Sequence, residues 1–286
     1  MVRIIWRDLA GWYETAAKAI QDAEARVQVN LRLARIEWQE LNNTDHARRA
    51  YHEVLANDDA NVDALDALET IYEQVGDHPE LLKVYRRRFD VSPYAGEKIA
   101  YAFKMASELS DHLEDVEGAI GAVRMVLDLD PEYEMAYRQL DALYTRAERW
   151  YDLAGVLNQR VALAGEASER SYLRMRLAEV LETRLEDVAG AVEVYRLILE
   201  DDPRNEDALG QLERLFGSAD VRVAVAGILL PAYRLRENDA RLVEVYDVLA
   251  EAAPELDARL GHWATIAGLH EQRLGNLDQV FAYRAR

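Results

Sequence analysis

The stretch Leu177–Phe216, LAEVLETRLEDVAGAVEVYRLILEDDPRNEDALGQLERLF, decides the architecture of this chain. Its apolar residues recur three and four positions apart, which predicts three amphipathic helical segments. Leu-Glu-Asp and Asp-Asp-Pro-Arg-Asn separate the segments. The same skeleton returns after shifts of 72 residues, which relate Pro203 to Pro131 and then to Asp59. A register kept without a gap is typical of a repeat protein.

The 72-residue period predicts a single continuous solenoid over residues 1–286. Its units span, in order, residues 22–93, 94–165 and 166–254, with partial units at both ends. In the third unit 17 additional residues near 218–234 read as one extra helix that contains Pro231. A proline inside a helix removes a hydrogen bond and clashes with the preceding turn, so we expect a kink or a shortened helix. Because both ends fall inside a unit and lack a polar cap, the pattern also indicates an excerpt from a longer array.

The apolar spacing and the turn residues place the individual helices. Asn, Asp and Gly-Asp steps separate them and supply caps. The helices are expected near residues 6–20, 22–42, 44–57, 61–75, 78–90, 94–112, 115–128, 132–147, 150–164, 168–184, 187–200 and 204–216.

Each 72-residue unit divides into two helix pairs of about 34 and 38 residues, and these pairs resemble the tetratricopeptide (TPR) repeat, a helix-turn-helix unit of 34 residues. The matching positions in one copy are Leu177, Ala178, Leu181, Ala191, Tyr195, Ile198 and Pro203. The second half-units depart from the pattern by carrying Glu69, Asp141 and Glu213 where the family has a small residue. The resemblance implies an all-α, right-handed superhelix of stacked antiparallel helix pairs. A HEAT-like array is the alternative.

Composition narrows the class of function. Half of the 286 residues are apolar, and there is no cysteine, so no disulfide framework or thiolate metal site can form. The net charge is −19, which would repel a nucleic acid duplex. The apolar stretch near 223–231 is far too short for a membrane span. We expect a cytoplasmic protein, and the abundant arginine and alanine suggest a GC-rich bacterial genome.

Residues that could carry catalysis or bind a metal show no convincing spacing. His46 and His52 point to different sides of a helix. His262 and His270 share a face, but no third ligand lies at metal-binding spacing between them. There is no phosphate-binding glycine loop. We therefore expect no catalytic residue, no metal and no cofactor.

The resemblance implies that the first helix of each pair lines a concave groove. Basic residues on those helices would favour an acidic peptide or a C-terminal carboxylate. The alternative is that they pair with neighbouring glutamates across repeats. The candidate groove residues are Arg35, Lys104, Arg138, Arg146, Arg176 and Arg214.

These observations predict a non-enzymatic scaffold that binds a peptide or protein segment in its concave groove. One alternative is a structural module that forms homo-oligomers by stacking through its uncapped ends. Another is a regulatory or docking segment of a larger enzyme. Neither nucleic acid nor membrane insertion is expected.

Overall fold

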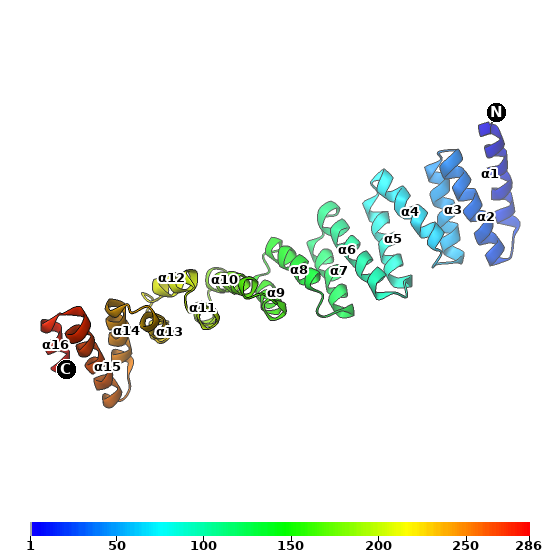
Figure 1. Ribbon diagram of the computed structural model, residues 1–286. Coiled ribbons are helices and arrows are strands. Elements are labelled where there is room, and N and C mark those ends of the chain that lie inside the picture. Colours follow the sequence, from blue (N-terminus) through cyan, green and yellow to red (C-terminus); the bar gives the residue numbers. More distant parts are fainter. Residues whose placement is uncertain (1) are drawn as a thin grey trace. The chain divides into compact units, whose positions relative to one another are not determined.

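The computed structural model describes residues 2–286, and within that range it contains sixteen α-helices and no strand (Figure 1). Within Val2–Arg146 and within Trp150–Arg284, helices that follow one another in the chain pack side by side and are joined by short turns. The predicted all-α helical repeat is confirmed. The contacts between helices divide the chain between Ala147 and Glu148 into two compact units, each of which is a stack of helices.

The first unit contains eight helices, and two of them end in a π-helical turn. In order, its elements are α1 (Val2–Ala19), α2 (Ala23–Arg35), η1 (Ile36–Glu40), α3 (Thr44–Asn57), α4 (Val62–Val75), α5 (His78–Val91), α6 (Ala95–Ser107), η2 (Glu108–His112), α7 (Val116–Leu129) and α8 (Glu134–Arg146).

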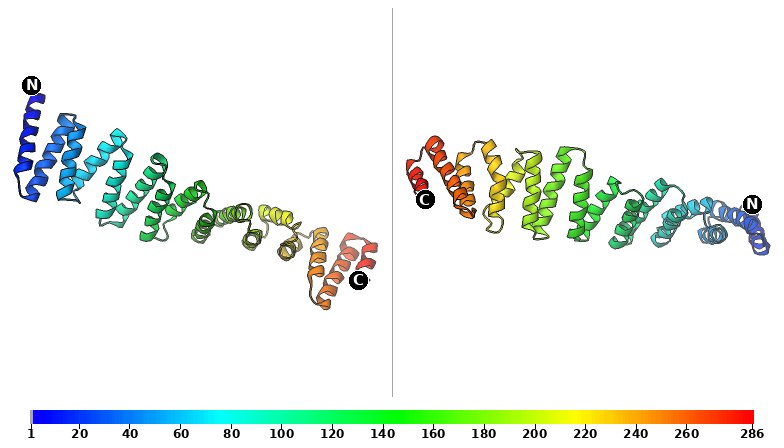
Figure 2. Two further views of the ribbon diagram at one scale, coloured as in Figure 1. Left: turned by 180° about the vertical axis from the view of Figure 1, so that it is seen from behind. Right: turned by 90° about the horizontal axis from the view of Figure 1, so that it is seen from below.

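The second unit also contains eight helices. In order, its elements are α9 (Trp150–Leu163), α10 (Ala167–Thr183), α11 (Val188–Asp201), α12 (Glu206–Leu215), α13 (Arg222–Leu235), α14 (Asp239–Ala252), α15 (Leu256–Leu269), η3 (His270–Leu274) and α16 (Leu277–Arg284). The two views in Figure 2 show that, within each unit, every helix lies beside the next one in the chain.

Burial of one apolar stripe per helix builds the core of each unit. On α4, the stripe Leu65, Leu68, Ile71 and Tyr72 is almost completely buried. Because α3 and α5 pack on either side of α4, the stripe is covered by both neighbours. Burial of each such side chain contributes about 1.5–3 kcal/mol to folding.

Side chains of Asp and Asn cap the helices, as the sequence predicts. Asp115 accepts a hydrogen bond from the Gly118 backbone at 2.8 Å, and 72 residues later Asp187 accepts one from Gly190 at the same distance. Both bonds satisfy a backbone N–H that the first turn of a helix leaves unpaired. The repeat therefore preserves the local chemistry of its turns.

The three acidic residues that depart from the TPR pattern are accommodated in different ways. Glu69 on α4 forms an ion pair with Lys104 on α6, and Glu213 accepts a hydrogen bond from the Tyr233 hydroxyl at 2.7 Å. Asp141 is buried in α8, with 3% of its surface exposed. Two of the departures, Glu69 and Glu213, thus bond to a side chain of a neighbouring helix.

The additional residues near 218–234 form α13, and Pro231 lies inside this helix. The helix continues through Pro231 to Leu235 and has 14 residues, as many as the following helix α14. The proline therefore does not shorten it.

Candidate functional site

The six basic residues singled out in the sequence all lie on the first helices of the helix pairs, or on α12. The first helix of each pair, and also α12, is called an A-helix. The A-helices are α2, α4, α6 and α8 in the first unit, and α10, α12, α13 and α15 in the second. The four residues in the first unit are Arg35 on α2, Lys104 on α6, and Arg138 and Arg146 on α8. The two in the second unit are Arg176 on α10 and Arg214 on α12.

In the first unit, two of these residues bridge successive A-helices. Arg35 donates to Asp63 on α4 at 2.8 Å, and Lys104 donates to Glu69 on α4 at 2.5 Å. About half of the Arg35 and Lys104 side chains is exposed, at 51% and 45%. The charged groups are therefore both paired and accessible from solvent.

Aromatic rings surround Lys104. Its ammonium lies 5.1 Å from the ring centre of Tyr85 and 5.2 Å from that of Tyr101, within the range of cation–π attraction. The Tyr85 hydroxyl donates to Glu73 at 3.1 Å. Burial raises the pKa of Tyr85 above its ordinary value, and the neighbouring carboxylates add to that shift. Tyr85 is therefore a neutral donor at physiological pH.

The two arginines of α8 make different contacts. Arg138 pairs with Glu134 one turn earlier on the same helix. Arg146 donates to the Ser110 carbonyl oxygen on η2 at 3.0 Å. Arg146 also lines a cavity of about 260 Å³ between α6–η2 and α8, together with Ser107, Ser110 and Gln139. This hollow lies between two successive A-helices.

In the second unit, Arg176 and Arg214 line one larger cavity of about 670 Å³ between α10 and α12. Arg214 donates to both carboxylate oxygens of Glu182, at 2.6 and 2.7 Å, and to Gln211 at 3.0 Å. Because Nη2 donates to Glu182 and Nε donates to Gln211, the guanidinium is held in one orientation. The Arg214 side chain is still 52% exposed.

Apolar and aromatic residues complete the wall of the α10–α12 cavity. Tyr172 and Met175 on α10 line it, and Tyr195 on α11 contributes a hydroxyl-bearing ring. Burial raises the pKa of Tyr195 to about 12. The sequence prediction considered only charge and missed these residues, although Tyr172, Met175 and Arg176 are spaced to share one face of α10.

A third cavity of about 430 Å³ lies between α13 and α15. Arg234, Tyr246 and Arg273 line it, together with Asp239 and Gln272. Hollows between successive A-helices, lined by arginine with polar or aromatic side chains, therefore occur three times.

The structure also brings together three residues that the sequence analysis did not connect. His78 on α5 lies beside Glu108 and His112 of η2. Glu108 and His112 lie 30 and 34 residues after His78 in the chain, so metal-ligand spacing within one helix could not connect them with His78. Their proximity depends on the packing of α5 against η2, which only the tertiary structure shows.

No helix among residues 2–286 combines the length and the apolar character that a bilayer crossing requires.

The similarities to known proteins concern solved structures of helical repeat proteins. The protein MamA is 16% identical with a TM-score of 0.36, and the match covers 63% of this chain and 94% of that one. YrrB, described as a TPR protein with an unusual peptide-binding site, is 13% identical with a TM-score of 0.36, covering 70% and 97%.

The C-terminal part of a TPR repeat-containing protein from Cytophaga hutchinsonii is 13% identical with a TM-score of 0.38, covering 87% of this chain and 98% of that one. No protein-family model and no curated protein sequence matches the chain. The chain itself is an all-α array of repeated helix pairs.

Proposed function

We propose that this chain is a non-enzymatic scaffold that binds a peptide or protein segment on the surface of its A-helices. The observation that carries this proposal is the α10–α12 cavity, which combines Arg176, Arg214, Tyr172 and Met175 in one hollow. Tyr172, Met175 and Tyr195 give the hollow apolar surface, and its other lining residues are polar or charged groups that can hydrogen-bond a ligand and fix its orientation. Arginine and tyrosine are also the residues that contribute most to protein interfaces.

The chemistry of the hollow favours a peptide with a carboxylate beside an apolar side chain. Arg214 is held in place by Glu182, which is only 15% exposed, so the guanidinium is oriented before a ligand arrives. An arginine has five N–H donors and can bind a second acceptor while keeping its first. A preformed orientation reduces the entropy lost on binding.

The experiment begins by isolating a bound segment. The full chain is used as bait in a lysate of the source organism, bound proteins are identified by mass spectrometry, and overlapping peptides of each are titrated by fluorescence anisotropy. We expect one short segment to bind, and the double variant Arg176→Glu, Arg214→Glu to weaken its binding at least tenfold, which is about 1.4 kcal/mol. The milder Arg176→Gln, Arg214→Gln variant should weaken it less.

A matched control reverses two charges on the second helices of the pairs. Arg196 on α11 pairs with Glu193 and Glu200, and Arg241 on α14 pairs with Glu244. The variant Arg196→Glu, Arg241→Glu should bind the segment as the wild type does. Equal weakening by both double variants, or none by either, would overturn the proposed site. Light scattering that shows the mass growing with concentration would favour the stacking alternative instead.

A further inference from the structure

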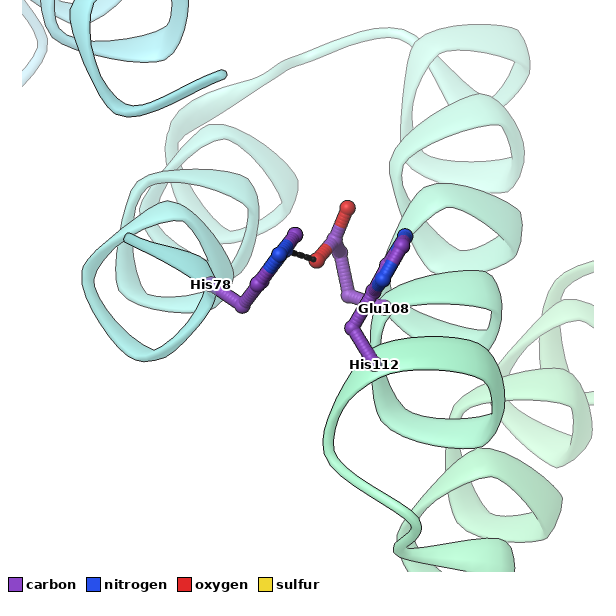
Figure 3. Close-up of side chains that lie close together, drawn as sticks. All are labelled: His78, Glu108 and His112. Atoms are coloured by element: carbon purple, nitrogen blue, oxygen red, sulfur yellow. Dashed lines mark hydrogen bonds and ion pairs between the residues drawn. The ribbon is translucent and has the colours of Figure 1, made fainter. Parts of the chain in front are cut away.

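The cluster His78, Glu108 and His112 joins two elements of the first unit (Figure 3). His78 is the first residue of α5, and Glu108 and His112 are the first and last residues of η2. His78 Nδ1 lies 2.9 Å from a carboxylate oxygen of Glu108. The rings of His78 and His112 are stacked, with centres 4.0 Å apart and planes inclined by 8°.

The distances between the ligand atoms of these three residues are close to those in the coordination shell of a metal ion. One ligand atom from each residue can be chosen so that all lie within 4.8 Å of one another. Around a tetrahedral zinc ion with bonds of about 2.1 Å, ligand atoms lie roughly 3.4 Å apart. The remaining gap is of the size that side-chain rotation closes, and the His112 side chain is exposed to solvent.

The same position in other repeats is filled by different chemistry. One copy later, Trp150 lies under the guanidinium of Arg184 at 4.8 Å. In the pair that begins with Asp239, Arg273 donates to that carboxylate at 3.3 Å. In each case the two residues are 34 positions apart, as His78 and His112 are. Those copies join the two helices by a cation–π contact or an ion pair, whereas the His78 copy presents three metal-ligand side chains.

We propose that His78, Glu108 and His112 bind a zinc ion, with a water molecule completing the four ligands. Two imidazoles and one carboxylate are a donor set that zinc uses with an open fourth position. The ion would link the start of α5 to the end of α6–η2, the role that Arg184 and Arg273 perform in their copies. The excess of acidic residues over the whole chain favours the approach of a divalent cation.

The test uses the full chain without a polyhistidine tag, stripped of metal by a chelator. Zinc chloride is titrated by calorimetry, and cobalt(II) is added separately as a spectroscopic probe. We expect one zinc ion per chain and visible absorption bands of tetrahedral cobalt that zinc abolishes. His112→Gln and Glu108→Gln should each weaken zinc binding at least tenfold. Because His112 is exposed, its variant should keep the helical circular dichroism of the wild type.

His46→Gln is the matched control. His46 also lies near a carboxylate, with its Nδ1 3.9 Å from Glu37, but it belongs to no three-ligand group among the described residues. This variant should bind zinc as the wild type does. Absence of zinc binding by the wild type, or equal binding by the wild type and His112→Gln, would overturn the proposal.

Discussion

Among residues 2–286, seven turns between helices contain one residue with a left-handed backbone. Two of these residues are glycines, Gly76 and Gly275, with φ of 69° and 66°. The other five carry a side chain: Asn42, Glu114, Glu148, Glu186 and Glu237, with φ between 51° and 56°. In every case an Asp, Asn or Arg follows and is the N-cap of the next helix. The backbone shape of the turn is thus maintained even where its residue is not glycine.

Gly76→Ala should destabilise the chain by about 1 kcal/mol, because a Cβ atom is unfavourable at positive φ. The side chain itself would meet no obstacle closer than His78 Nε2 at 4.0 Å, so the cost is one of backbone conformation. Urea denaturation followed by circular dichroism measures it. The control is Gly121→Ala, in the middle of α7 with nothing within 4 Å, which should be stabilising by about 0.5–1 kcal/mol. Equal effects of both substitutions would contradict this account.

His52 couples stability to pH. Its Nε2 lies 2.7 Å from the Tyr72 hydroxyl, across the contact between α3 and α4. Burial raises the pKa of Tyr72 to about 12, so this hydroxyl keeps its proton and donates to a neutral His52. Burial also lowers the pKa of His52 below its ordinary value of about 6.5, and Arg48, Arg87 and Lys83 act in the same direction, opposed by Glu80.

The sign of the resulting pH dependence follows from the lowered pKa. Below about pH 6.5 the unfolded chain binds a proton at His52 that the folded chain does not, so folding loses stability as the pH falls through this range. The stability advantage of the wild type over His52→Gln should therefore shrink between pH 7.5 and 5.5. Urea denaturation at the two pH values measures it, and a pH-independent difference between the two proteins would contradict the coupling.

At the scale of elements, α13 takes the part of a first helix in its pair. Its buried Leu229 and Tyr233 precede Leu242 and Tyr246 of α14 by thirteen residues each. The same separation relates Leu68 and Tyr72 on α4 to Leu81 and Tyr85 on α5. The strongest contacts of α13 are with α14, although it also touches α11 and α12. Two A-helices, α12 and α13, therefore follow each other directly in the second unit.

For the whole molecule, the division into two units of stacked helices predicts that a core substitution destabilises the neighbouring helices rather than the whole chain. Leu212 on α12 is completely buried, so Leu212→Ala should cost about 2–5 kcal/mol. Hydrogen exchange should then accelerate in α11, α12 and α13, which are in contact, and remain unchanged in α2–α5.

Leu140→Ala on α8 is the converse control, since Leu140 is 2% exposed in the first unit. Hydrogen exchange in the Leu140→Ala variant should accelerate in α7 and α8 and remain unchanged in α14–α16. A uniform loss of protection along the chain in either variant would show that the array unfolds as one cooperative body.

The sequence was sufficient to predict most helices to within a few residues. For α3 the predicted limits of 44–57 coincide with the observed helix. The π-helical ends of α2 and α6 could not be predicted, because their hydrogen bonds depend on how the last turn packs. The sequence also placed the six basic residues on A-helices, but charge alone could not decide between free and paired side chains. Arg214 and Lys104 proved to be paired with carboxylates of a neighbouring helix.

By itself, the sequence determined the repeat, the helices and their caps, because apolar periodicity and turn residues act over a few positions of the chain. Only the tertiary structure decided which side chains meet across helices: the arginine–carboxylate bridges, the hollows between A-helices, and the approach of His78 to Glu108 and His112. Those contacts join residues about 30 positions apart, and their geometry depends on how closely each helix packs against the next.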